Sequence, residues 1–292
     1  MAGTSIHSVY RRTARAAAQQ RIVKKTSNID VERARTDFAY FCDVVGDKPP
    51  AEHHKEWHKY LCTGEDSECL IGIGGPNIDI LAPRGSAKST ILGLYTAWAV
   101  GVHALARKPL KILYISYTVD VARPKSAAIK RIIEESKAYK EIFPTVKIAK
   151  GINSNEYWSI DWKFAGIRTA GEEEFTVCCA GLKGAVTSKR SHLCIIDDAI
   201  KSADDIKNRD IRQAMEDNWN SVIVPTMFEG GRAICLGTRF RHDDIHNSTF
   251  IPANDWVQIV QSAISVDGNG DEQSYWPEMW SLDYLRDRRR QA

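Results

Sequence analysis

The sequence lacks the marks of secreted and membrane proteins. Its seven cysteines form no C-x-x-C pair, and several lie in apolar runs, which is typical of reduced core thiols in a cytosolic protein. No apolar signal segment is present at the N-terminus, as secretion would require. The one membrane-like run, Thr90 to Ala106, is at the lower limit for a span. It directly follows a candidate phosphate loop, so we expect a buried helix there and no membrane association.

A large surplus of one charge is also absent. The 292 residues carry 40 Lys and Arg against 37 Asp and Glu, a formal net charge of +3. The charge is +6 over residues 1–29, −6 over residues 30–285 and +3 over residues 286–292. An acidic body argues against a basic DNA clamp, so the two basic ends are the candidate contacts with DNA or neighbouring partners.

Strand-like and helical patterns alternate through the middle of the chain. Apolar runs on both faces predict buried strands, and the segments between them predict helices, which together indicate an α/β fold with a mainly parallel sheet covered on both sides. The expected strands are 78–82, 112–116, 177–180, 193–196 and 233–237, and the expected helices are 88–106, 119–137 and 205–220.

The two ends differ from this pattern. Residues 1–30 indicate a basic flexible arm, or a helix that orders on a partner, and residues 31–65 a helical extension broken at Pro49-Pro50. We assign residues 66–265 to the main domain. Beyond Arg239 we expect mostly irregular chain, with a turn at 268–270 and a charged helix at 281–290. Residues 266–292 are interpreted as a C-terminal linker segment.

The strongest motif is the segment Ala82 to Thr90, placed between an expected strand and an expected helix. A phosphate loop needs small residues that let backbone N–H groups converge, a lysine for the outer phosphates and a hydroxyl for Mg²⁺. Lys88 and Ser89 stand where that chemistry requires them. Alanines replace both glycines of the G-x-x-x-x-G-K-[ST] pattern, so an ordinary strand-to-helix turn stays the alternative. The expected nucleotide-binding residues are Arg84, Gly85, Ser86, Ala87, Lys88, Ser89 and Thr90.

Two further strands end in polar residues. The apolar run before Asp197 and Asp198 is typical of a Walker B strand, whose acid holds Mg²⁺; a plain strand end that caps a helix is the alternative. The run 233–237 ends in Thr238-Arg239. Ligands of open α/β sheets lie at the carboxyl ends of the strands, so we expect the three strand ends to meet at one crevice.

Several motifs in this order resemble the large terminase subunit, the ATP-driven DNA-packaging motor of tailed bacteriophages. The resemblance covers roughly residues 38–290. The residues that carry it are 38–41, His54 near Trp57, 82–89, Arg190 ahead of 195–198, 236–240, 241–244 and 275–278.

The resemblance implies a P-loop ATPase of the additional-strand, RecA-like type, with ATP and Mg²⁺ as cofactors. It implies that Lys88 contacts the β- and γ-phosphates, that Ser89 and Asp197 hold Mg²⁺ and that Asp198 positions the attacking water. Many relatives have Glu at that last position, so with Asp the water must sit closer or the strand end must advance. Thr238 and Arg239 resemble the family's coupling motif; a polar strand end is the alternative.

Two arginines are candidates for stabilising the transition state. Arg84 lies inside the loop and could act as an arginine finger, with a surface ion pair as the alternative. Arg190 is the competing candidate, in cis or toward a neighbouring subunit. His54 falls where relatives place an adenine-contacting side chain, although a histidine beside His53 and His58 is more often a surface residue. No further ligand suggests a metal at these histidines.

The resemblance also implies partners. These are double-stranded DNA, the procapsid portal protein, the small terminase subunit and further copies in a ring, in the host cell cytoplasm. DNA contact should be to phosphates, independent of sequence. Besides the arm, the candidates are Arg123, Lys125, Lys130 and Arg131, for which a solvated helix face is the alternative.

Two other functions stay open at this point. One is a helicase-like ATPase, although the residues after Phe240 are too few for a second motor domain. The other is a degenerate nucleotide- or DNA-binding module, because the loop lacks two glycines. The run 241–244 could be mistaken for a nuclease cluster, but we expect solvated carboxylates there. The family's nuclease is a separate C-terminal domain, so we expect no DNA cleavage by this chain.

Overall fold

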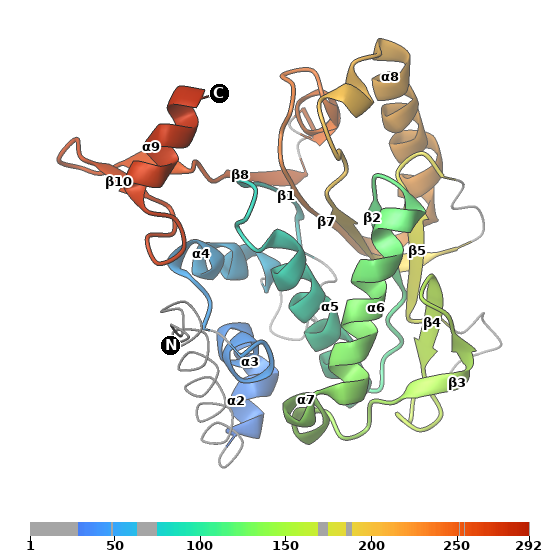
Figure 1. Ribbon diagram of the computed structural model, residues 1–292. Coiled ribbons are helices and arrows are strands. Elements are labelled where there is room, and N and C mark those ends of the chain that lie inside the picture. Colours follow the sequence, from blue (N-terminus) through green and yellow to red (C-terminus); the bar gives the residue numbers. More distant parts are fainter. Residues whose placement is uncertain are drawn as a thin grey trace, which may run out of the picture.

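The computed structural model describes residues 29–47, 49–62, 75–168, 175–184, 189–250, 252–253 and 255–291. An eight-stranded sheet in the order β3-β4-β5-β2-β6-β7-β1-β8 forms its centre (Figure 1). The strands are β1 (Asn77–Leu81), β2 (Ile112–Ser116), β3 (Ile148–Asn153), β4 (Tyr157–Ile160), β5 (Val177–Gly181), β6 (Ser191–Asp197), β7 (Met227–Gly237) and β8 (Trp256–Val260).

The strand order defines the type of the sheet. All neighbours from β5 to β8 are parallel, whereas β4 and β3 continue the sheet in antiparallel fashion. Strand β7 lies between β1, which leads into the loop with Lys88, and β6, which ends at Asp197. A strand inserted between these two is the additional strand that the resemblance implies. The expected α/β, P-loop-type fold is therefore confirmed.

Helices cover both faces of the sheet. Alternate residues of β1 face opposite sides of the sheet. Ile78 and Ile80 belong to the larger apolar core, and Asp79 faces the other side. The larger core lies under α5 (Lys88–Leu105), α6 (Val119–Glu135) and α7 (Lys137–Ile142), with α2 (Val31–Thr36), α3 (Phe38–Val45) and α4 (Glu52–Leu61) packed outside α5. The smaller core lies under α8 (Arg209–Asn218) and the π-helical turns Trp219–Ile223 and His246–Phe250.

A buried arginine fastens the N-terminal helices to the sheet. Arg232 of β7 is fully buried, and its guanidinium donates to the carbonyls of Pro76 at 2.6 Å, Leu61 at 3.2 Å and Tyr60 at 2.5 Å. Two of these carbonyls end α4, where a cation also complements the helix dipole. The helical extension is thus part of the folded body.

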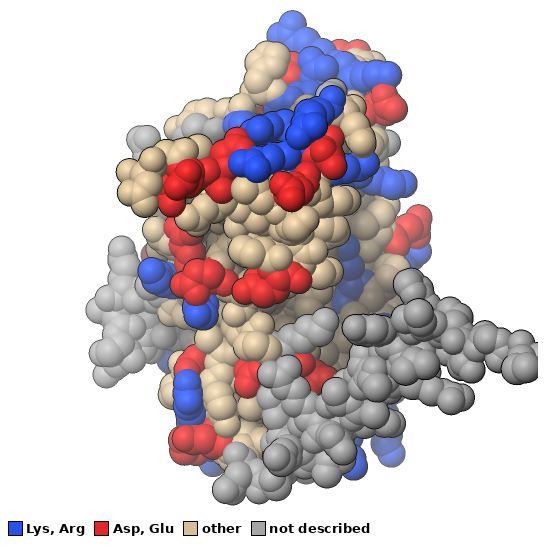
Figure 2. All heavy atoms as spheres, turned by 60° about the vertical axis from the view of Figure 1, so that its left-hand side comes forward, with Lys and Arg blue, Asp and Glu red and all other residues tan. Residues whose placement is uncertain are grey.

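The C-terminal residues form a small unit beside α4. Strands β9 (Ile264–Val266) and β10 (Glu272–Ser274) pair as an antiparallel hairpin around the predicted turn at 268–270, and α9 (Leu282–Gln291) follows. Arg286 and Arg289 of α9 both pair with Glu272, at 2.7 and 2.8 Å. On the face drawn in Figure 2, basic side chains gather above the middle with acidic ones directly beside them.

Most predicted elements are confirmed, two expectations are wrong and two strands were missed. The chain beyond Arg239 is not mostly irregular, because β8 pairs with β1 in the main sheet. Strands β3 and β4 were not expected. The helix expected at 119–137 is divided at Ser136, whose hydroxyl caps α7 by accepting from the backbone N–H of Tyr139 at 3.2 Å. The basic arm, apart from its last two residues, lies outside the described residues. None of the helices that the structure describes is long and apolar enough to span a membrane.

Candidate functional site

The loop between β1 and α5 contains two residues in the left-handed conformation. Gly85 has φ +80° and Ala87, directly before α5, has φ +60°. The left-handed conformation costs an alanine about 1–2 kcal/mol, which the surrounding contacts must offset. The backbone N–H of Ala82 donates to the carbonyl of Gly237 at 3.0 Å, which ties the start of the loop to the end of β7.

Lys88 extends back into this loop. Its ammonium donates to the carbonyls of Ala82 at 3.1 Å and Pro83 at 2.9 Å and to Oγ1 of Thr238 at 3.1 Å. Burial lowers the pKa of Lys88, partly against the charges of Asp198 and Asp197. Thr238 also donates to the carbonyl of Ala82 at 3.1 Å. The predicted loop lysine and the predicted coupling threonine are therefore in direct contact.

The acidic end of β6 meets the start of α5. Ser89 donates from Oγ to Oδ1 of Asp197 at 2.9 Å. The other carboxylate oxygen of Asp197 accepts from the Tyr114 hydroxyl at 2.7 Å and lies 3.0 Å from Nζ of Lys125. Asp197 is fully buried, so a carboxylate at this position requires these partners.

Asp198 turns out of the strand into the cavity. It has φ +56°, an unusual conformation outside glycine that is often found at functional sites. Its backbone N–H donates to the carbonyl of Leu236 at 3.0 Å, and its own carbonyl accepts from the N–H of Tyr117 at 3.2 Å. Burial, and next the charge of Asp197, raise the pKa of Asp198. A raised pKa suits a carboxylate that orients water and accepts a proton.

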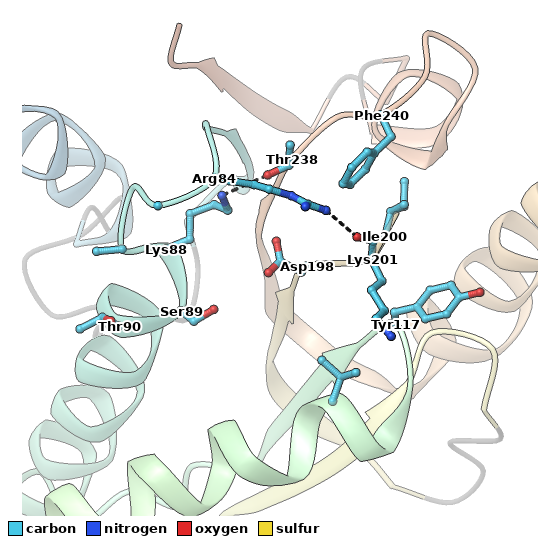
Figure 3. A pocket seen from close by; sticks show the side chains of 13 residues that line it. Arg84, Lys88, Ser89, Thr90, Tyr117, Asp198, Ile200, Lys201, Thr238 and Phe240 are labelled. Atoms are coloured by element: carbon cyan, nitrogen blue, oxygen red, sulfur yellow. Dashed lines mark hydrogen bonds between the residues drawn. The ribbon is translucent and has the colours of Figure 1, made fainter. Parts of the chain in front are cut away.

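A cavity of about 460 Å³ joins these groups. Figure 3 shows Asp198 at its centre, between Lys88, Ser89 and the long side chain of Arg84. Arg84 crosses the cavity: its Nη2 donates to the carbonyl of Lys201 at 2.9 Å and its guanidinium lies 5.2 Å from the ring centre of Phe240. The remaining lining residues are Gly85, Ala87, Thr90, Tyr117, Val121, Ile200 and Thr238.

The chemistry of the lining fits a magnesium nucleotide. Three cationic side chains, Arg84, Lys88 and Lys201, line one cavity and complement the charge of a triphosphate. The hydroxyl of Ser89 faces this cavity with the carboxylate of Asp197 behind it, a set of hard oxygen donors of the kind that Mg²⁺ prefers.

The structure excludes the alternative that His54 is a surface residue. His53, His54 and His58 are buried. Nδ1 of His54 accepts from the N–H of Ala51 at 3.1 Å, so its Nε2 carries the proton and donates to the carbonyl of Ser86 at 2.8 Å. Burial lowers the pKa of His54. His54 thus supports the backbone of the loop, while its predicted contact with adenine stays a prediction.

Two predicted arginines lie outside the cavity. Arg190 precedes β6 and rests on the ring of Phe228 at 4.7 Å, whereas Asp197 ends the same strand roughly 20 Å away at about 3.3 Å per residue. A finger role for Arg190 in cis therefore does not fit the structure, and only a role toward a neighbouring subunit stays a prediction. Arg239 points to Asn247, with Nη1 3.3 Å from Oδ1, and does not line the cavity.

The carboxylates at 243 and 244 stabilise the loop after β7. Asp244 is buried and accepts from the backbone N–H groups of Phe240 and Arg241 at 3.0 and 3.1 Å. Asp243 pairs with Arg212 at 2.7 Å and with Arg241 at 2.8 Å. The expectation of a solvated carboxylate is therefore wrong for Asp244, and both acids have partners within the loop or on α8.

Three of the four basic residues of α6 are engaged within the protein, whereas Arg131 is exposed and its contact with DNA stays a prediction. Arg123 pairs with Glu156 at 2.6 Å, and Lys130 donates to Oδ1 of Asn153 at 2.8 Å. Lys125, which we expected to contact DNA or solvent, contacts Asp197. A helical charge pattern alone does not distinguish such an inward lysine from a solvated one.

Local sequence patterns did not indicate two tryptophan contacts, one with the loop and one with the histidine that supports it. The indole of Trp280 lies against Gly85, with Nε1 3.4 Å from its carbonyl, and the ring of Trp276 lies 5.3 Å from His54. Both tryptophans belong to a segment almost 200 residues further along the chain, and local patterns do not report such packing.

Comparison with known proteins gives structural matches alone. No family model matches the chain, and no curated protein matches it. Solved structures do match. The matches include phage DNA-packaging ATPases and large terminases.

Three of the matches illustrate the degree of similarity. The N-terminal domain of the bacteriophage phi29 DNA packaging ATPase is 13% identical, with a TM-score of 0.39, over 64% of this chain and 91% of that one. A large terminase ATPase domain from a Thermus phage is 14% identical, with a TM-score of 0.44, over 82% and 92%. The HK97 large terminase is 15% identical, with a TM-score of 0.47, over 84% of this chain and 46% of that protein. At these values the functional assignment rests on the site itself.

Proposed function

We propose that this protein is an ATPase whose site lies between the loop 82–90 and the carboxyl ends of β6 and β7. The observation that carries the proposal is the 2.9 Å hydrogen bond from Ser89 to Asp197. It joins the residue after the loop lysine to a strand-end acid more than 100 positions away. An ordinary strand-to-helix turn would not require a fully buried carboxylate at that point.

Each residue has a task in this reaction. Lys88 binds the outer phosphates, and Ser89 with Asp197 would hold Mg²⁺, which polarises the phosphates when bound. Asp198 orients the attacking water and takes its proton. Arg84 is held over the cavity by Lys201 and Phe240, where a guanidinium can offset the charge that develops on the transferred phosphoryl group.

The further proposal is that hydrolysis drives double-stranded DNA into a procapsid. The support is the order of motifs along the sequence, together with a site whose Thr238, at the predicted coupling position, contacts the loop lysine. The portal protein, the small terminase subunit and a ring of further copies are the partners proposed for this role, in the cytoplasm of the host cell.

A triplex-displacement assay tests translocation without strand separation. The protein, ATP and Mg²⁺ are incubated with a duplex that carries a labelled third strand, and with a forked duplex as the control substrate. A packaging motor displaces the third strand and leaves the fork paired, whereas a helicase separates the fork. We also expect duplex DNA to stimulate ATP hydrolysis by the unmodified protein, and we expect Lys88→Ala to lose this hydrolysis. A protein that binds nucleotide and neither hydrolyses it nor displaces the third strand would be the degenerate module.

A further inference from the structure

Lys125 is the one lysine of α6 that reaches the two strand-end acids. Its ammonium lies 3.0 Å from Oδ2 and 3.1 Å from the backbone carbonyl of Asp197, and 3.8 Å from Oδ2 of Asp198. It also lies 3.5 Å from Oγ of Ser116. The Lys125 side chain is 19% exposed and that of Asp197 is 0% exposed, so this contact is shielded from water.

The two oxygens of Asp197 have different neighbours. Oδ1 accepts from Ser89, which lines the cavity, whereas Oδ2 receives Tyr114 and Lys125 from the opposite side. Lys125 therefore neutralises the acid pair without occupying the side on which a cation beside Ser89 would bind. Because Asp197 is fully buried and Lys125 largely buried, water screens the repulsion between Lys125 and a second cation less than it would at the surface.

We propose that Lys125 is a positioning residue that serves as the internal counter-cation of Asp197 and Asp198. It holds the Asp197 carboxylate in place and keeps the acid pair from binding a divalent cation ahead of nucleotide. The triphosphate then supplies the missing negative charge, so the metal enters together with the nucleotide. This inference rests on the proposed ATPase function and adds the order in which its two cofactors bind.

Binding of Mn²⁺ without nucleotide tests the inference, since Mn²⁺ is a spectroscopic substitute for Mg²⁺. Free Mn²⁺ is measured by electron paramagnetic resonance in titrations of the full chain and of Lys125→Gln, whose amide can still donate to the Asp197 carbonyl. We expect Lys125→Gln to bind Mn²⁺ at least about tenfold more tightly than the unmodified protein, because one positive charge has been removed from the acid pair. Equal or weaker binding would overturn the inference.

Matched variants separate charge from structure. Lys125→Arg keeps the charge, so it should bind Mn²⁺ as tightly as the unmodified protein does. Lys130→Gln removes a charge from the same helix, but at a residue that contacts Asn153 and not the acids. It should therefore leave the affinity for Mn²⁺ unchanged as well. Tight binding in Lys130→Gln would contradict the local origin of the effect. If Lys125→Gln did not fold, the unmodified protein alone would still test the proposal. A dissociation constant for Mn²⁺ below about 10 μM in the absence of nucleotide would contradict it.

Failure of this inference can be distinguished from failure of the proposed ATPase function. Absence of Lys88-dependent hydrolysis would contradict the ATPase while leaving the Mn²⁺ difference measurable. Hydrolysis together with equal Mn²⁺ binding by the unmodified protein and Lys125→Gln would contradict the role of Lys125 alone.

Discussion

Trp280 covers Gly85 at the tip of the phosphate loop. A Cβ built on Gly85 would lie 2.7 Å from the indole ring, and the φ of +80° is unfavourable for any other residue. The same indole stacks on Tyr284 of α9 at 5.4 Å. The C-terminal unit and the loop therefore restrict each other's conformation.

We expect Gly85→Ala to weaken ATP binding and to lower the melting temperature, since both the conformation and the contact with Trp280 must change. The matched control is Gly151→Ala, where no heavy atom lies within 4 Å and φ is not positive. Nucleotide titration and thermal unfolding of the two variants measure the difference. Equal effects of the two substitutions would show that the loop tip is unconstrained.

Arg84→Ala should reduce turnover and leave nucleotide affinity largely intact. The guanidinium lies across the cavity and not around the loop backbone, and loss of a preorganised donor for transition-state charge costs on the order of 100-fold in rate. Steady-state hydrolysis and binding of a non-hydrolysable ATP analogue provide the two readings. Lost binding at unchanged maximal turnover would instead assign Arg84 to positioning of the substrate.

The buried histidines of α4 make the stability fall in acid. Burial lowers the pKa of His53 and His58 to about 4, from an ordinary value of 6.5. The unfolded chain takes up these protons near pH 6.5 and the folded protein does not, so the contribution is complete above pH 6.5 and is lost as the pH falls toward 4. Each histidine changes the free energy of unfolding by roughly 1.4 kcal/mol per pH unit in that window.

His58→Leu tests this account of the acid sensitivity. The ring of His58 lies 4.5 Å from that of Phe38, an apolar setting that leucine can occupy. Urea unfolding between pH 4 and 7 should show a dependence on pH that is shallower by about one proton. A slope identical to that of the unmodified protein would mean that His58 is protonated in the folded state.

Arg232→Met should destabilise the attachment of α4. Methionine fills similar volume but leaves the carbonyls of Pro76 and Tyr60 without the guanidinium, whereas the carbonyl of Leu61 keeps the Tyr95 hydroxyl as a donor at 3.1 Å. We expect a cost of about 3 kcal/mol. Urea unfolding of this variant and of Arg131→Met, at an exposed position of α6, gives the comparison. An equally small change in the free energy of unfolding of both variants would show that Arg232 does not stabilise the attachment of α4.

The site was largely predictable because its residues follow strands. Asp197, Asp198 and Thr238 stand at the end of buried apolar runs, and Lys88 and Ser89 begin the helix that follows another such run. A parallel sheet brings these ends to one edge. Local sequence thus indicated where these five residues meet, whereas their roles stay predictions.

The missed features depend on packing between distant segments. Strand β8 is half-exposed along most of its length, so its sequence lacks the continuous apolar pattern of a central strand. His54 is buried by the loop at Ser86 and by Trp276, and Lys125 turns inward because Asp197 requires a partner. The sequence around each of these residues contains no pattern that would predict its contact.

Hydrolysis of ATP with Mg²⁺, by the unmodified protein and by Lys88→Ala, tests the central claim most directly. The variant removes the ammonium held by Ala82, Pro83 and Thr238 without changing the acids of β6. The account predicts phosphate release by the unmodified protein that falls by at least about 100-fold in the variant. Equal rates in both proteins, or no release by the unmodified protein with or without duplex DNA, would contradict it.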